Sequence, residues 1–259
     1  MSKQRQIETD GYAIVPQMYA ANECQQLADA LYAALSCCTD DATSLRRANG
    51  AIYGARNLLA IFPAAKTLWR KQPLLDLLTD VLGDGFGLVR GLYFDKPADG
   101  NWSLPWHQDL TIAVEDHSLP SKRFRNRTLK AGVPHVEAPD EVLQQMLTLR
   151  IHLDEVTAEN GPLQVLPGSH VGRDSSKAFR PPETILAAAG DVLAMRPLLS
   201  HASLSSHSST ARHRRVIHLE FSAGGELPDG YRWHQFVPVR AEFRAVLLPH
   251  LQSRGGRSN

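Results

Sequence analysis

The stretch that decides the fold is LTLRIHLDEVTAENGPLQVLPGSH, residues 147–170. Two short apolar segments, residues 147–153 and 163–166, are separated by the turn signal ENGP and followed by the turn signal PGS. Segments of this length, bounded by Gly, Pro and Asn, are typical of β-strands. The stretch therefore predicts short strands joined by tight turns.

The same pattern of short apolar segments separated by turn signals continues on both sides of this stretch. Residues 87–94, 191–195 and 216–221 also read as short strands, and such a series predicts an antiparallel sandwich or jelly roll. The first part of the chain differs, because apolar residues recur at helical spacing over residues 20–36 and 68–82. The predicted helices precede the predicted strands and do not alternate with them. The sequence therefore argues against an α/β fold built of βαβ units. The expected fold class is mostly β with flanking helices.

The composition is that of an ordinary globular protein. The chain has 259 residues, of which 43% are hydrophobic and 21% charged, and its net charge is +1. One domain of this length buries its own core, and so small a net charge does not draw it to nucleic acid or to acidic membranes. The three cysteines show no zinc or disulfide spacing, and no signal peptide or run of about 18 apolar residues is visible. We expect a cytoplasmic protein, a monomer or a small homo-oligomer.

Two His-x-Asp motifs are candidate metal sites. They are His107-Gln108-Asp109 and His152-Leu153-Asp154. In an extended strand, residues two apart face the same side, so an imidazole and a carboxylate can hold one metal together. His201 is a candidate third ligand. Two histidines and one carboxylate form the facial triad of non-haem Fe(II) oxygenases, but the spacing by itself does not choose between the two motifs.

Four longer motifs, in this order, resemble the phytanoyl-CoA dioxygenase family. They are LPWHQDLT at 104–111, LDEVTAENGPLQVLPGSH at 153–170, AGDVLAMRPLLSHAS at 189–203 and RRVIHLEF at 214–221. The resemblance implies an Fe(II)- and 2-oxoglutarate-dependent oxygenase with a double-stranded β-helix (jelly roll, cupin-like) core. It implies a single oxygenase domain over residues 1–259, with a helical part at about 1–85 and the core at about 86–240. Residues 252–259 are expected to form a disordered tail.

The resemblance also implies the metal ligands. In the family, the His-x-Asp motif precedes the ENGPL and PGSH block, so the matching ligands are His107, Asp109 and His201. His152 and Asp154 then fall on the strand before ENGPL, where Asp154 is expected to be structural.

A buried arginine is implied for the distal carboxylate of 2-oxoglutarate, because a guanidinium presents a planar fork to a carboxylate. The family places it at the start of the last core strand. Arg214 matches when counted from the strand, and Arg212 matches when counted from His201; we favour Arg214. Ser203 matches a family hydroxyl that supports the same carboxylate.

The implied activity is oxidation, most simply hydroxylation, of a small-molecule substrate with O2, releasing succinate and CO2. The presence of Asp109 argues against a halogenase, because related halogenases lack this carboxylate. Two alternatives stay open: a non-catalytic or sensory cupin-like binder, and a zinc hydrolase with the same ligands. The paired arginines before the last strand count against the hydrolase.

The segment 118–139 is expected to be a lid. It carries five cations among prolines and glycines and shows little apolar periodicity, so we expect weak order there without substrate. Arg90, Lys96 and Trp102 are further residues that can touch substrate or co-substrate.

Overall fold

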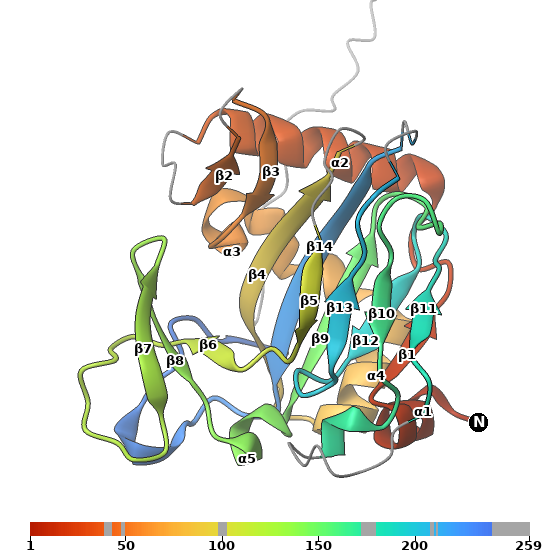
Figure 1. Ribbon diagram of the computed structural model, residues 1–259. Helices are drawn as coiled ribbons and strands as arrows, with labels where there is room; N and C mark the ends of the chain where they lie inside the picture. Colours follow the sequence, from red (N-terminus) through yellow and green to blue (C-terminus); the bar gives the residue numbers. More distant parts are fainter. Residues whose placement is uncertain are drawn as a thin grey trace, which may run out of the picture.

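A large antiparallel sheet forms the back of the molecule (Figure 1). The computed structural model describes residues 1–38, 43–47, 50–97, 103–171, 180–207, 210 and 212–239. The order of strands in the large sheet is β1-β12-β9-β14-β4-β3-β2, with β15 paired to β4. Their bounds are β1 Tyr12–Val15, β2 Ser44–Arg46, β3 Ile52–Ala55, β4 Gly87–Lys96, β9 Met146–His152, β12 Val192–Met195, β14 Arg214–Ser222 and β15 Val237–Pro238.

A second sheet lies in front of the large one, in the order β11-β10-β13-β5 (Figure 1). Its strands are β5 Leu104–His107, β10 Leu163–Val165, β11 Glu183–Ile185 and β13 His201–Ser203. Two facing antiparallel sheets of short strands are the double-stranded β-helix expected from the sequence. The prediction of a mostly β fold with flanking helices is therefore confirmed.

The two central strands of the large sheet divide their side chains between its faces. Leu149 and Ile151 on β9 and Leu219 and Phe221 on β14 belong to the main hydrophobic core. The residues between them, including Arg150, point to the opposite face, toward the second sheet. One face of the sheet is thus apolar and the other carries the polar chemistry.

Helices cover the apolar face. The bounds of the helices and 3-10 turns are α1 Lys3–Asp10, α2 Ala21–Ser36, α3 Leu58–Ile61, η1 Pro63–Lys66, η2 Leu68–Arg70, α4 Gln72–Leu82, α5 Asp140–Leu143, η3 Ser169–Val171 and η4 Pro228–Gly230. In α2, Leu31 and Leu35 are buried, and in α4, Leu74 and Leu78 are buried in the same core. Each fully buried leucine contributes roughly 1.5–3 kcal/mol. Within the described residues, no helix has the length and apolar character needed to cross a membrane.

The region at about 1–85 is less helical than expected. Besides the helices it contributes β1, β2 and β3, which pair with β12, with each other and with β4. Residues 12–16 read as a short strand in the sequence, which β1 confirms, but β2 and β3, of three and four residues, carry too little periodicity to stand out.

The segment 118–139, expected to be a weakly ordered lid, contains regular strands, and its closing over a substrate stays a prediction. Most of this segment is a β-hairpin of β7 (Arg125–Lys130) and β8 (Val133–Glu137), and β8 also pairs with β6 (Thr111–Ala113). Phe124 and Val136 are buried, and the Asn57 side-chain amide donates to the Ala131 carbonyl at the tip, at 3.0 Å. Since β7 is largely exposed, it lacks the apolar periodicity that reveals a strand in a sequence. Trp102 and the tail at 252–259 lie outside the described residues.

Candidate metal centre

The second sheet brings two histidines face to face. His107 ends β5, His201 begins β13, and the two are cross-strand partners, with ring centroids 4.2 Å apart. Asp109 follows β5, and its Oδ2 lies 3.8 Å from Nε2 of His201. One ligand atom from each of the three residues lies within 4.8 Å of the others. The structure thus brings together the three residues that the family resemblance implies as metal ligands.

Backbone carbonyls orient both imidazoles. Nδ1 of His107 lies 2.7 Å from the Pro105 carbonyl, and Nδ1 of His201 lies 2.9 Å from the Leu199 carbonyl. Because a carbonyl oxygen only accepts, each Nδ1 carries the proton and each Nε2 keeps its lone pair. This is the arrangement in which a histidine binds a metal through Nε2.

Hydrogen bonds also fix the position of the segment that carries Asp109. The Asp109 N–H donates to the Pro197 carbonyl at 2.9 Å, and the Gln108 amide donates to the Leu198 carbonyl at 2.6 Å. Both acceptors lie on the segment that leads into β13, so the two ligand-bearing segments are tied together.

The charge states suit a divalent metal. Burial is the largest influence on Asp109 and opposes its ionisation, but His201 and the neighbouring cationic groups outweigh it and keep the Asp109 pKa below its usual value. Burial lowers the pKa of His201 to about 4, and Asp109 only partly offsets this. A neutral imidazole and an ionised carboxylate are the forms that bind iron, and a triad of this kind leaves coordination positions open.

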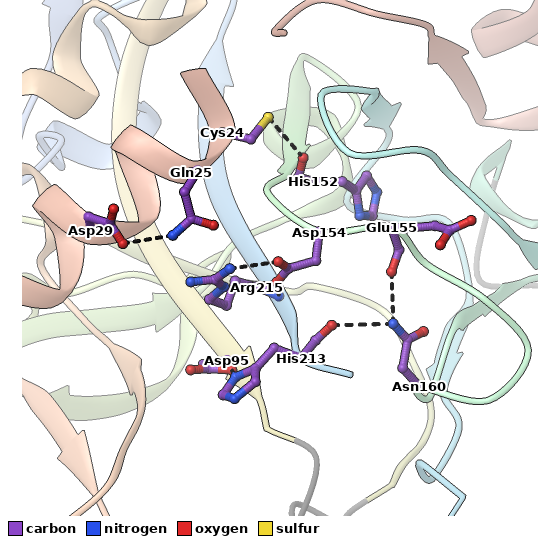
Figure 2. Close-up of polar contacts among 10 residues, drawn as sticks. All are labelled: Cys24, Gln25, Asp29, Asp95, His152, Asp154, Glu155, Asn160, His213 and Arg215. Atoms are coloured by element: carbon purple, nitrogen blue, oxygen red, sulfur yellow. Dashed lines mark hydrogen bonds and ion pairs between the residues drawn. The ribbon is translucent and has the colours of Figure 1, made fainter. Parts of the chain in front are cut away.

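The second His-x-Asp motif has a different environment (Figure 2). The chain bends after His152, and Asp154 accepts from the Arg215 side chain at 2.7 and 2.9 Å and from the Arg215 N–H at 2.8 Å. The His152 ring is buried, and its two nitrogens have no hydrogen-bond partner among the described residues. Asp154 is engaged as a structural ion pair, so this motif does not present a histidine and a carboxylate to one metal.

Nearby contacts hold the same region together (Figure 2). Asn160 donates to the carbonyls of Glu155 and His213, at 2.8 and 3.3 Å, and Nδ1 of His213 lies 3.1 Å from Asp95. The turn signal at 159–162 therefore fastens the end of β9 to the start of β14.

Arg214 and Ser203 meet inside the molecule. Nη2 of Arg214 donates to Ser203 Oγ at 3.2 Å, and Nζ of Lys96 donates to the same oxygen at 3.0 Å. All three residues are buried, and Nε of Arg214 has no partner among the described residues. Burial, and secondly the nearby Arg150, lower the pKa of Arg214 to about 9, while burial and Arg214 lower that of Lys96 to about 7. Two adjacent buried cations around one hydroxyl suit a carboxylate.

Arg212, the alternative, lies elsewhere. It is exposed and forms an ion pair with Glu155 at the surface. The regular strand begins only at Arg214, so the alternation of faces along a strand does not extend to Arg212.

A cavity of about 110 Å³ lies between the sheets and joins the two groups of residues. His107, Asp109 and His201 line it together with Ser203 and Arg214. The positions predicted for the metal and for the carboxylate therefore open into one space.

Other polar residues line or adjoin this cavity and were missed in the sequence. Arg150 and His218 line it, and Glu220 lies next to His218. The available signal was a polar residue at every second position of an otherwise apolar segment, in TLRIHL and IHLEF. Such alternation in a buried strand indicates that one face of the strand lines a polar site and not the hydrophobic core.

Comparisons with known proteins agree with this geometry. Residues 7–214 match the family described as "Phytanoyl-CoA dioxygenase (PhyH)". The chain is 26% identical, over 180 residues, to a probable alpha-ketoglutarate-dependent hypophosphite dioxygenase from Stutzerimonas stutzeri. That match covers 66% of this chain and 54% of the relative, so the chain spans about half the length of this curated relative.

Solved structures share the fold. The alpha-ketoglutarate-dependent epimerase SnoN from nogalamycin biosynthesis superposes with a TM-score of 0.62 at 17% identity, covering 88% of this chain and 85% of SnoN. EctD from S. alaskensis, solved with 2-oxoglutarate and 5-hydroxyectoine, gives a TM-score of 0.61 at 20% identity, covering 85% and 74% of the two chains.

Proposed function

Because this chain belongs to the phytanoyl-CoA dioxygenase family, we propose that it is an Fe(II)- and 2-oxoglutarate-dependent dioxygenase that oxidises a small molecule. The proposal rests chiefly on one observation. A His-Asp-His group with free Nε2 atoms and a buried Arg-Ser-Lys group line or border the same cavity. A sensory binder needs only the first group, and a zinc hydrolase has no use for the second.

In this proposal His107, Asp109 and His201 hold the iron. When bound, iron(II) supplies the activation of O2 that couples oxidation of the substrate to conversion of 2-oxoglutarate into succinate and CO2. The protein contributes orientation. The carbonyls of Pro105 and Leu199 keep both imidazoles in the ligating tautomer.

Arg214, Ser203 and Lys96 receive the distal carboxylate of 2-oxoglutarate. The unpartnered Nε of Arg214 and the hydroxyl of Ser203 provide donors to it. Lys96 adds a second positive charge beside the same hydroxyl. A carboxylate bound here relieves the repulsion between two buried cations, and the burial of Lys96, Ser203 and Arg214 limits screening of the interaction by water.

The substrate is proposed to be a free small molecule. The near-neutral charge of the chain gives no support to a nucleic-acid or membrane substrate, and hypophosphite, named for the Stutzerimonas relative, is a small molecule. Among the described residues the three cysteines form no disulfide, which suits the reducing cytoplasm. We also propose that residues 1–259 form a single oxygenase domain, acting as a monomer or small homo-oligomer.

Succinate formation tests the proposal. The purified protein is incubated with Fe(II), 2-oxoglutarate and air, with and without small-molecule candidates, and succinate is measured by mass spectrometry. We expect slow succinate release without substrate, faster release with one, and none after chelation of the metal or in the His201→Ala variant. An absence of both succinate formation and 2-oxoglutarate binding in the metal-loaded protein would contradict it.

A further inference from the structure

A chain of polar side chains crosses the inner face of the large sheet. Nη2 of Arg90 lies 2.7 Å from Oε1 of Glu220, and Nε2 of His218 lies 3.1 Å from the same oxygen. Nδ1 of His218 lies 3.1 Å from Nη1 of Arg150. One neutral tautomer satisfies both histidine contacts, with Nε2–H donating to Glu220 and Nδ1 accepting from Arg150.

Arg150 stands at the end of this chain, and the carboxylate whose charge acts on it is Asp109, one of the three residues of the candidate metal centre. It is only 7% exposed, and its Nε has no hydrogen-bond partner in the described part of the protein. The carboxylates of the described residues form no ion pair with it, because Glu220 is paired with Arg90. Its guanidinium carbon lies 5.8 Å from the centre of the Phe94 ring. A buried cation without an ion-pair partner is costly, so this side chain has the character of a ligand-binding group.

Arg150 faces the cavity that contains the candidate metal centre. It lines the same cavity as His107, Asp109 and His201. On the neighbouring strand it is opposite His218, four residues along β14 from Arg214, which is about 13 Å at the rise of an extended strand. The backbones of the two arginines therefore lie at different levels of the sheet, although Arg150 is close enough to Arg214 to help lower its pKa.

The charge balance of the cavity supports a second anion. Iron(II) and Asp109 together leave one positive charge, and Arg214 adds another, which balances the dianion of 2-oxoglutarate. Arg90 and Glu220 neutralise each other. The charge of Arg150 then remains, and Lys96 adds to it whenever it is protonated.

We propose that Arg150 binds the anionic group of the substrate, and that the substrate is a compact monoanion carrying a carboxylate or a phosphorus oxyanion. This inference rests on the proposed function. The guanidinium fork suits either group, and a cavity of about 110 Å³ that also receives 2-oxoglutarate suits a compact molecule. His218 is a positioning residue, because its Nδ1 holds one arm of the fork and leaves Nε and the other arm for the anion.

Binding near the metal tests this without turnover. The protein is loaded with Mn(II) and 2-oxoglutarate, and paramagnetic relaxation by the metal is measured for three probes: hypophosphite by phosphorus NMR, and acetate and neutral acetamide by proton NMR. We expect at least one of the anions to be relaxed with 2-oxoglutarate still bound, and acetamide not to be. The two anions distinguish a phosphorus oxyanion from a carboxylate.

Variants assign the effect to the side chain. Arg150→Met should weaken binding of the anion by roughly 10–150-fold, as expected for charge-assisted hydrogen bonds, and Arg150→Lys should restore part of it. Arg125→Met, which removes an exposed arginine on β7, is the control and should bind the anion as the wild type does. The comparison of acetate with acetamide on the wild type needs no variant to fold.

Several results would overturn the inference. They are equal binding of acetamide and acetate, no binding of either anion, unchanged anion binding in Arg150→Met, and anions that displace 2-oxoglutarate. A large loss of 2-oxoglutarate affinity in Arg150→Met would assign the residue to the co-substrate instead. None of these results contradicts the proposed function, provided that the wild type binds 2-oxoglutarate and forms succinate.

Discussion

The two His-x-Asp motifs share their spacing and differ in nearly everything else. At His107 and Asp109, the facing strand delivers a third ligand and the carboxylate is free to bind a metal. At His152 and Asp154, the chain bends and the carboxylate pairs with Arg215. The residues that the neighbouring strand places beside the motif, and not the motif itself, therefore decide whether a histidine and a carboxylate can form a metal site.

The contrast extends to the arginines beside each motif. Arg214 points into the cavity of the first motif, whereas Arg212 and Arg215 pair with Glu155 and Asp154 beside the second. On the inner face of the sheet, Arg150 and Arg214 form no ion pair with a carboxylate of the described residues, whereas the arginines beside the second motif form matched ion pairs. The following predictions test this division.

The largest effect is expected on metal binding. His201→Ala should lower the affinity for Fe(II) or Mn(II) by more than the roughly 10–100-fold that loss of an outer partner costs, because it removes a ligand. His152→Ala, the matched control from the second motif, should retain the metal. Metal titration by calorimetry under anaerobic conditions measures both, and retention in the first variant with loss in the second would reverse the assignment.

The next effect concerns 2-oxoglutarate. Arg214→Ala leaves a buried carboxylate without its guanidinium, which costs roughly 3–5 kcal/mol, so the Kd for 2-oxoglutarate should rise on the order of a hundredfold or more. Metal affinity should change little. Arg214→Lys should recover only part, because an ammonium lacks the planar fork.

Arg212→Ala is the control for that variant, because its side chain is exposed and paired at the surface. It should leave the Kd for 2-oxoglutarate near the wild-type value. A large effect of Arg212 with a small effect of Arg214 would mean that the co-substrate site is wrongly placed.

A smaller effect is expected when the second motif loses its carboxylate. Asp154→Asn weakens the hydrogen bonds to Arg215, whose side chain is about one-fifth exposed, and should lower the free energy of unfolding by about 1–3 kcal/mol. Urea denaturation measures the change. Metal and 2-oxoglutarate binding should persist, and their loss would show that the two regions are not independent.

The smallest effect is a pH dependence from Lys96. Its pKa is lowered to about 7, first by burial and then by Arg214. Below that pH the ammonium is present before the carboxylate binds, and above it binding must take up a proton, so 2-oxoglutarate affinity should fall by up to about tenfold per pH unit. Calorimetry in buffers of different ionisation enthalpy measures the proton uptake.

Lys96→Met should abolish this pH dependence. The unliganded wild type should show the opposite trend in its own stability, which should rise with pH above 7, because the unfolded chain then binds more protons at this lysine than the folded one does. An identical pH dependence of 2-oxoglutarate binding in the variant and the wild type would exclude Lys96 from the site.

Much of the fold was predictable from local patterns. Short apolar segments between turn signals marked β4, β9, β10, β12 and β14, and helical periodicity marked α2 and α4. The order of the family motifs marked His107, Asp109, His201 and Arg214 as candidates. These features depend on residues that are close together in the chain, where periodicity and turn chemistry act directly.

Tertiary structure decided the rest, because it depends on which distant strands pair and in which register. The pairing of β13 with β5 brings His201 to His107, and the bend after His152 turns Asp154 toward Arg215. The hairpin at β7 and β8 is held by cross-strand hydrogen bonds in an exposed sequence without apolar periodicity. Arg150 has no ion pair with Glu220, which is paired with Arg90 across β14 and β4. Register between strands is set by burial summed over the whole sheet, and a sequence window does not contain that sum.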